Sequence, residues 1–265
     1  MSDLFDFDGD LDIEQPGGQD ETGDQPAATG DLEKWAEDQL ADDSAPLFFD
    51  IETGPAPEEQ LAELYHEKTL EEFSATCDKR WKPDTVAKKY EEYKTGAWEN
   101  FVGKAALSAI TGRVLMVGML QDWEFAGIMD DYERATLKAF WEVTANALDA
   151  KRRLIGHNSN GFDLPFLVRR SWMLGVHVPR EVKHGRYWNP LFVDTMEAWG
   201  CGSRDFIRLN DLGQCFGVGQ KTEGFAGKDF HKFWFGTPEE RQLAIDYCEQ
   251  DVRLTAAIAG KMGLV

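Results

Sequence analysis

The sequence has few cysteines, no long hydrophobic run and almost no basic charge near its start. Its four cysteines lack the CxxC spacing of metal-binding motifs, and its five histidines add no zinc pattern. No apolar stretch approaches the length that spans a bilayer. The first residues, MSDLFDFDGD, contain neither the basic nor the apolar region of a secretory signal. These absences favour a cytoplasmic protein with reduced thiols and no membrane contact.

The acidic charge is concentrated at the N-terminus. Residues 1–45 hold 15 of the 48 acidic residues and one of the 28 Lys and Arg residues, so they carry −14 of the net charge of −20. Their Gly, Gln and Pro content predicts a disordered tail. The opening MSDLFDFDGDLDI has the composition of a short docking peptide, with a solubilising tail as the alternative. Residues 46–265 are only mildly acidic, which argues against a protein that coats long duplex DNA.

Two acids interrupt an apolar run just after this tail. Asp50 and Glu52 lie in LFFDIETGP, whose apolar residues predict a buried strand over residues 47–52. Side chains two residues apart in a strand share a face, so both carboxylates point the same way. A solvent-facing edge strand is the alternative, and the flanking Phe49 and Ile51 argue against it.

A third acid, Asp163, lies in GHNSNGFDLPFL, between a predicted strand over 153–156 and a predicted helix over 162–175. One interpretation is that Asp163 caps this helix, because Asp before Leu-Pro is a good N-cap. The other interpretation is that Asp163 joins Asp50 and Glu52 at a common site.

The last acid of interest lies in IDYCEQDVRLT, within a helix predicted over 238–262 that starts with a good N-cap, Thr237. Tyr247 and Asp251 are one turn apart. They share a face with the apolar residues Leu243, Leu254 and Ile258. An acid on an apolar face is costly unless it is paired or bound to metal. Four carboxylates that converge from strands and a helix are what a two-metal phosphodiester-cleaving site requires.

The elements between these fragments predict a mixed α/β sheet with helices on both faces. Further strands are expected at 113–120, at 123–129 and up to Asp194, and further helices at 131–150 and 209–216. Residues 57–107 are expected to form a mainly helical insertion after the first strand. This insertion includes a basic and aromatic stretch between Lys79 and Lys94.

The three acidic fragments, in this order, resemble the Exo I, Exo II and Exo III motifs of the DEDD 3′–5′ exonuclease superfamily. The Tyr-x-x-x-Asp form of the third motif is typical of its DEDDy branch. Over residues 46 to 262 the chain is similar to stand-alone bacterial and phage exonucleases related to the proofreading domain of family-B DNA polymerases. The resemblance implies a ribonuclease-H-like fold with a five-stranded mixed sheet in residues 46–265, preceded by the acidic tail.

The resemblance also implies roles for particular residues. Asp50, Glu52, Asp163 and Asp251 would hold two Mg²⁺ or Mn²⁺ ions, and Tyr247 would orient the attacking water. An ordinary tyrosine hydroxyl is too weak an acid to serve as a free base at neutral pH, which favours orientation. The expected substrate contacts, each with a core or turn role as the alternative, are Thr53, Gly54, Asn158, Phe162 and Lys228.

The function that follows is a metal-dependent 3′–5′ exonuclease that releases nucleoside 5′-monophosphates from single-stranded or frayed DNA. A 3′–5′ exoribonuclease is the first alternative, because nothing in the sequence selects against a 2′-hydroxyl group. The second is a non-catalytic adaptor that binds a replication or repair protein through the acidic tail. The presence of all five motif residues counts against the adaptor, which would not need them.

Overall fold

A five-stranded mixed sheet forms the centre of the computed structural model, which describes residues 45–182, 188–203, 205–219 and 227–265. Residues 1–44 of the expected acidic tail lie outside the described part of the chain. The strands run in the order β3-β2-β1-β4-β5. Their bounds are Leu47–Pro55 for β1, Gly112–Gln121 for β2, Glu124–Ile128 for β3, Leu154–Gly156 for β4 and Phe192–Asp194 for β5.

The central strand β1 has neighbours of both orientations. It pairs antiparallel with β2, which pairs antiparallel with β3, and it pairs parallel with β4, which pairs parallel with β5. The apolar residues of β1 are buried on both faces of the sheet, as a central strand covered on both sides requires. The sheet is therefore mixed, as the sequence predicted.

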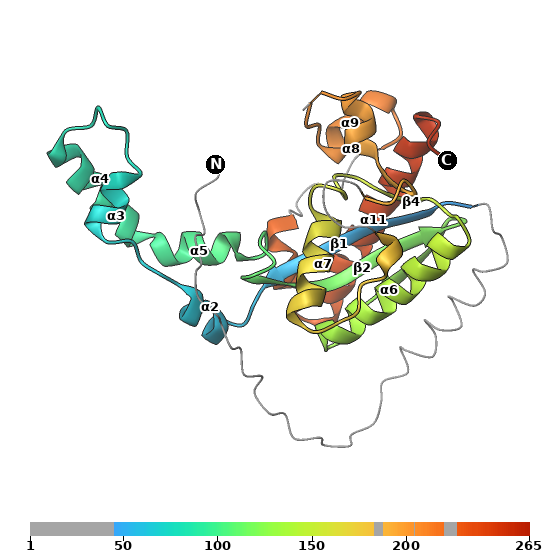
Figure 1. Cartoon of the computed structure of the whole chain (residues 1–265), viewed down its shortest axis with the longest axis horizontal. Helices are drawn as coiled ribbons and strands as arrows, with labels where there is room; N and C mark the ends of the chain where they lie inside the picture. The colour runs from blue at the N-terminus through green and yellow to red at the C-terminus, as the bar shows by residue number, and fades with distance from the viewer. Residues whose placement is uncertain (1–44, 183–187, 204, 220–226) are drawn as a thin grey trace, which may run out of the picture.

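Helices cover both faces of this sheet (Figure 1). One face packs α6 (Glu133–Asp149) and α7 (Asp163–Met173) against the core that contains Phe49. The other face packs α10 (Phe230–Trp234) and α11 (Pro238–Lys261) against the core that contains Phe48. The predicted α/β architecture is thus confirmed. The shorter helices are η2 (Arg180–Val182), α8 (Thr195–Gly200), α9 (Leu209–Phe216) and η3 (Gly227–Asp229).

Four helices lie between β1 and β2. They are α2 (Glu58–Leu64), α3 (Leu70–Ala75), α4 (Pro83–Thr95) and α5 (Ala97–Ala105). Figure 1 shows α3 and α4 far from the sheet, with α5 leading back toward the end of β1. Neither α3 nor α4 has a buried residue, and the rings of Phe73, Tyr90 and Tyr93 join the two helices. Aromatic packing within this arm therefore holds it together.

The longest helix, α11, begins where its sequence signals predict. Thr237 and Glu240 form a capping box around Pro238. The expectation that Leu243 lies on the buried face is wrong, because its side chain is 53% exposed. The buried side chains of α11 start at Ala244, so the first turns of the helix extend beyond the sheet. Within the described residues, neither α11 nor any other helix is long and apolar enough to cross a membrane.

Candidate active site

The candidate site lies where β1 and β4 separate. The two strands pair only at Leu47 and Phe48, which face Leu154 and Ile155. The chain that follows β4 then turns into α7 and leaves the next part of β1 without a strand on that side. Crevices of this kind, at the carboxyl ends of neighbouring strands, are where open α/β sheets bind ligands.

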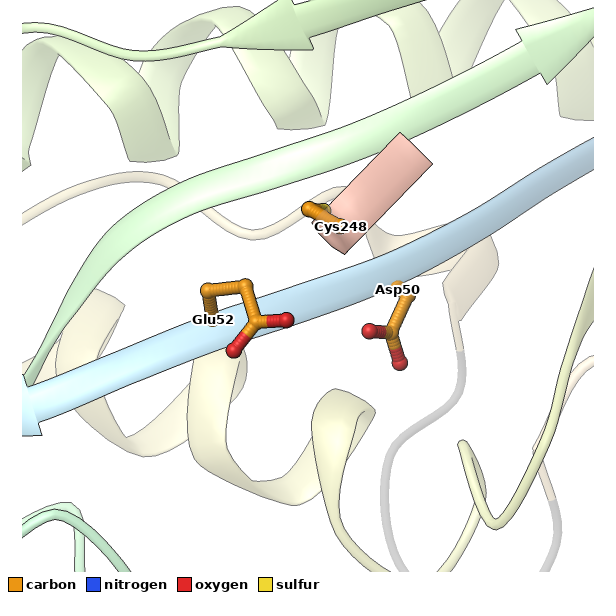
Figure 2. A group of neighbouring side chains, drawn as sticks. All are labelled: Asp50, Glu52 and Cys248. Atoms are coloured by element: carbon orange, nitrogen blue, oxygen red, sulfur yellow. The ribbon is translucent and has the colours of Figure 1, made fainter. Parts of the chain in front are cut away.

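Two acids and a thiol meet in this crevice. Asp50, Glu52 and Cys248 each offer a ligand atom, and these atoms all lie within 4.8 Å of one another. Figure 2 shows the Asp50 and Glu52 carboxylates on the same side of β1, as strand alternation predicts. The register of β1 against β2 shifts between Glu52 and Thr53, directly after the second acid. Such a bulge bends the strand and changes the direction of the side chains that follow it.

Asp163 reaches β1 from the opposite side of the crevice. Its Oδ1 accepts a hydrogen bond from the Ile51 N–H at 3.0 Å, and its carboxyl group is hydrogen-bonded to that of Asp50. The interpretation of Asp163 as a helix cap is wrong. The N-cap of α7 is Phe162, and Asp163 is the first residue of the helix, 3% exposed and turned toward the strand. Its side chain takes the place beside β1 that β4 leaves open.

The environment of Asp163 makes its ionised form costly. Burial, assisted by the charge of Asp194, raises the pKa of Asp163 to about 7. The Ile51 N–H and the Asp50 carboxyl group oppose this rise without cancelling it. With its pKa raised to about 7, Asp163 keeps its proton at mildly acidic pH in the metal-free protein. A bound cation would replace that proton.

Helix α11 brings three further side chains to the site, Tyr247, Cys248 and Asp251, all of them buried. Gly118, which faces Asp50 from β2, permits this approach, because a Cβ there would lie only 2.5 Å from the Cys248 Sγ. Burial raises the pKa of the Cys248 thiol well above its usual range, and the charges of Glu52, Asp50 and Asp251 add to the effect. Asp251 therefore lies within electrostatic reach of the same cluster.

Cys248 is the one member of this cluster that sequence reasoning missed. The cysteine spacing predicts only an ordinary reduced thiol at Cys248, because the four cysteines show no metal-binding pattern. A signal was nevertheless present. Cys248 precedes Asp251 by three residues, and residues three apart in a helix share a face.

The turn between β4 and α7 holds another of the predicted residues. Asn158 adopts a left-handed conformation, with φ of 58°, and its N–H donates to Asp194 Oδ1 at 2.9 Å. The Asn160 N–H donates to Asp194 Oδ2, and Asp194 Oδ1 also caps α8 by accepting from the Met196 N–H. Asp194 therefore fixes the loop that carries Asp163. The Asn158 side chain does not line the cavity described next.

A cavity of about 640 Å³ opens beside Glu52. Among the expected substrate contacts, Thr53 and Phe162 line it. Gly54 does not, and it lies instead between Leu115 and His231. Lys228 belongs to η3, and its side chain lies outside the described residues. Of the four predicted contacts that the structure describes in full, Thr53 and Phe162 thus line this cavity.

The donor atoms of the site fit a hard divalent cation. The carboxyl groups of Asp50 and Glu52 lie within reach of one ion, Asp163 is hydrogen-bonded to Asp50, and burial disfavours the ionised form of Asp163 without a compensating charge. Carboxylate oxygens are the ligands that Mg²⁺ prefers. The Cys248 thiol, whose pKa is raised, is a weak donor for such an ion, although its sulfur lies within 4.8 Å of the Asp50 and Glu52 ligand atoms.

Replacing Asp163 with Asn is expected to flatten the pH dependence of the metal-free protein's stability. Unfolded, the Asp163 carboxyl group ionises near its ordinary pKa of 3.8, whereas the folded protein retains its proton up to about pH 7. Between these values the unfolded chain binds fewer protons, so the free energy of unfolding falls as pH rises. Below pH 3.8 Asp163 is protonated in both the folded and the unfolded protein, and its contribution to the free energy of unfolding is fully present. Above about pH 7 this contribution is lost.

The measurement is thermal unfolding in the presence of a chelator, in steps between pH 4 and pH 8. The melting temperature of the wild type, relative to that of Asp163→Asn, should decline across this window. Asp246→Asn is the matched control, because Asp246 is an exposed acid on α11 that accepts a hydrogen bond from the Gln242 side chain. Parallel curves for the wild type and Asp163→Asn would contradict the raised pKa.

Comparisons with known proteins give a family and a fold. The model of a family described as "Predicted 3'-5' exonuclease related to the exonuclease domain of PolB" matches residues 92–259. This range contains Asp163, Tyr247 and Asp251 and begins after Asp50 and Glu52. No curated protein matches the chain.

Among solved structures, the chain is similar to the family B DNA polymerase from the hyperthermophilic archaeon Pyrobaculum calidifontis. The TM-score is 0.50 and the sequence identity is 18%, and the match covers 82% of this chain and 24% of the polymerase chain. At this identity the likeness shows the fold alone. It confirms the ribonuclease-H-like α/β architecture, which spans about a quarter of the polymerase.

Proposed function

Because the chain belongs to the family of predicted 3′–5′ exonucleases related to the exonuclease domain of PolB, we propose that it removes nucleotides from the 3′ end of single-stranded or frayed DNA with two divalent metal ions. The observation that carries this proposal is the meeting of carboxyl groups from β1 and α7 in one crevice. The ligand atoms of Asp50 and Glu52 lie within 4.8 Å of each other, and Asp163 is hydrogen-bonded to Asp50.

Asp50, Glu52, Asp163 and Asp251 would hold the ions, which we propose to be Mg²⁺ or Mn²⁺. When bound, two such ions supply an activated water and compensate the negative charge that develops on the phosphate and on the leaving 3′-oxygen. The chain's own contribution begins with the proton that burial retains on Asp163. Its release leaves the Asp163 carboxylate ionised and able to bind a cation.

Tyr247 would hold the attacking water through its hydroxyl group. The ring of Tyr247 is buried in the core between the sheet and α11, so its position is fixed. Its hydroxyl oxygen would lie 3.7 Å from a Cβ built at Gly227, a residue that lines the cavity beside Glu52. The hydroxyl group thus points toward the space that the substrate end would occupy, where a fixed donor orients water at little entropic cost.

We propose DNA as the substrate, and the alternative is RNA. The direct experiment uses 5′-labelled single-stranded DNA and RNA of the same sequence, each with Mg²⁺, with Mn²⁺ or with chelator. We expect stepwise shortening of DNA from the 3′ end, with nucleoside 5′-monophosphate as the product, only when a metal ion is present. Single-stranded DNA should be cut faster than a blunt duplex, because the end of a duplex must first open.

Several outcomes would contradict the proposal. Degradation in the presence of chelator would exclude a metal-dependent reaction, and internal cuts would exclude an exonuclease. Shortening of RNA alone would replace DNA with RNA as the substrate while leaving the chemistry of the site unchanged.

A further inference from the structure

The helical insertion supplies one wall of the cavity beside Glu52. Trp98, Val102 and Gly103 of α5, with Leu107 just after it, line this wall. Phe162, at the start of α7, lines the cavity as well. Figure 1 shows how α5 lies at the end of β1, between the sheet and the rest of the arm. The insertion therefore reaches the candidate active site through its last helix.

This wall is firmly attached to the strand that carries the acids. The Thr53 hydroxyl group, next to Glu52, donates to the carbonyl oxygen of Ala106 at 2.8 Å. The Thr111 hydroxyl group donates to the carbonyl oxygen of Ala105 at 2.9 Å. The Ala56 N–H, just after β1, donates to the carbonyl oxygen of Thr111 at 2.8 Å. These bonds fix the C-terminal end of α5 to β1. A ligand beside Glu52 would meet a preformed surface.

We propose that this cavity holds the 3′-terminal nucleoside of the substrate and that α5 provides the surface against which the terminal base packs. The inference rests on the proposed exonuclease function and adds the residues that bind the end of the strand. Glu52 belongs to both the acidic cluster and the cavity, so a nucleoside there has its 3′ end next to the acids. A volume of about 640 Å³ lies within the range of small-molecule sites.

The composition of the lining favours a neutral base over a phosphate group. Trp98, Leu107 and Phe162 offer aromatic and aliphatic surface, and the Trp98 ring is held in place by Tyr65, with ring centroids 5.1 Å apart. Bases bind such surfaces because each has an apolar π-face. The basic Lys232 is already paired with Asp229 at 2.6 Å, which reduces the attraction for a phosphate group.

Gly103 makes this proposal testable. A Cβ at Gly103 would meet no atom within 4 Å, although the residue lines the cavity. Because Gly103 borders the cavity and has open space around its Cβ, a larger side chain can be added there, and replacing a helical glycine does not weaken the helix. Gly103→Phe should therefore occupy the space proposed for the base. Asn100→Phe is the matched control, because it adds the same side chain to an exposed position of α5 outside the cavity.

The experiment compares single-stranded substrates that end in a normal nucleotide or in an abasic one. We expect the wild type to cleave the normal end with a kcat/KM about tenfold higher, as the loss of one base stack predicts. Gly103→Phe should raise KM for the normal end and remove this preference. Asn100→Phe should retain it. Leu107→Ala, at a position that is 68% exposed and so tolerates substitution, should reduce the preference without affecting folding.

Equal cleavage of the two ends by the wild type would overturn the proposal, and so would an unchanged preference in both Gly103→Phe and Leu107→Ala. In either case metal-dependent cleavage by the wild type would leave the proposed function standing. An absence of cleavage of any 3′ end by the wild type would instead contradict the proposed function and this inference together.

Discussion

Replacing Asp50 with Ala is expected to reduce cleavage to the background level. Asp50 belongs to both parts of the acidic cluster. Its carboxylate oxygen lies within 4.8 Å of the ligand atoms of Glu52 and Cys248, and its side chain is hydrogen-bonded to Asp163. Its removal would take away the ligand best placed to serve both ions. Because the proposed reaction depends on those ions for water activation and for charge compensation, nothing else in the site replaces them. The same result is expected for Asp251→Ala.

The fold should survive these substitutions. In the metal-free protein, the charges of Asp50, Glu52 and Asp251 all act on the buried Cys248 thiol, which shows that negative charge is concentrated there. Removing Asp50 or Asp251 lowers this charge, and Asp163 keeps its hydrogen bond from the Ile51 N–H, so the melting temperature in chelator should not fall. In the wild type, Mg²⁺ or Mn²⁺ should raise the melting temperature, because a ligand that binds the folded state stabilises it. Asp50→Ala should lose most of this rise.

Asp246→Ala is the matched control for the substitution on α11. Asp246 is exposed, adjoins Tyr247 in sequence and accepts a hydrogen bond from Gln242. Its removal should change neither the cleavage rate nor the effect of metal on melting. Activity retained by a pure preparation of Asp50→Ala would show that the crevice is not the catalytic site.

Local sequence patterns predicted the parts of the site that depend on strand and helix periodicity. The alternation of β1 placed Asp50 and Glu52 on one side, and the structure shows them there. The capping signals at Thr237 and Pro238 gave the start of α11. The order of strands and helices gave the mixed sheet, because each connection leaves few alternatives.

Features that depend on contacts distant in sequence could not be predicted in this way. The local sequence around Asp163 favours a helix cap, and only the early separation of β4 from β1 reveals why its side chain bonds to Ile51 instead. The approach of Cys248 depends on Gly118 in another element. Likewise, the insertion was predicted to be helical, but its position beside Glu52 is set by the bond between Thr53 and Ala106.

The second large effect is expected at Tyr247. Tyr247→Phe keeps the buried ring, which packs in the core between α11 and the sheet, and removes only the hydroxyl group. If this group orients the attacking water, turnover should fall by about ten- to a thousandfold, as expected for the loss of one positioned catalytic group. The change leaves the cavity beside Glu52 almost unaltered, so KM for the 3′ end should change little.

Rates and affinities together distinguish orientation of water from binding of substrate. Single-turnover kinetics of Tyr247→Phe should show a slow chemical step at saturating substrate, and the affinity measured in Ca²⁺ or chelator should match that of the wild type. Tyr132→Phe is the control, because Tyr132 is 79% exposed and should tolerate the same loss without effect. If Tyr247→Phe instead cleaves at the normal rate but binds the 3′ end poorly, the hydroxyl group contacts the substrate rather than the water. Its direction toward Gly227, at the edge of the cavity, would then mark the path of the nucleic-acid backbone.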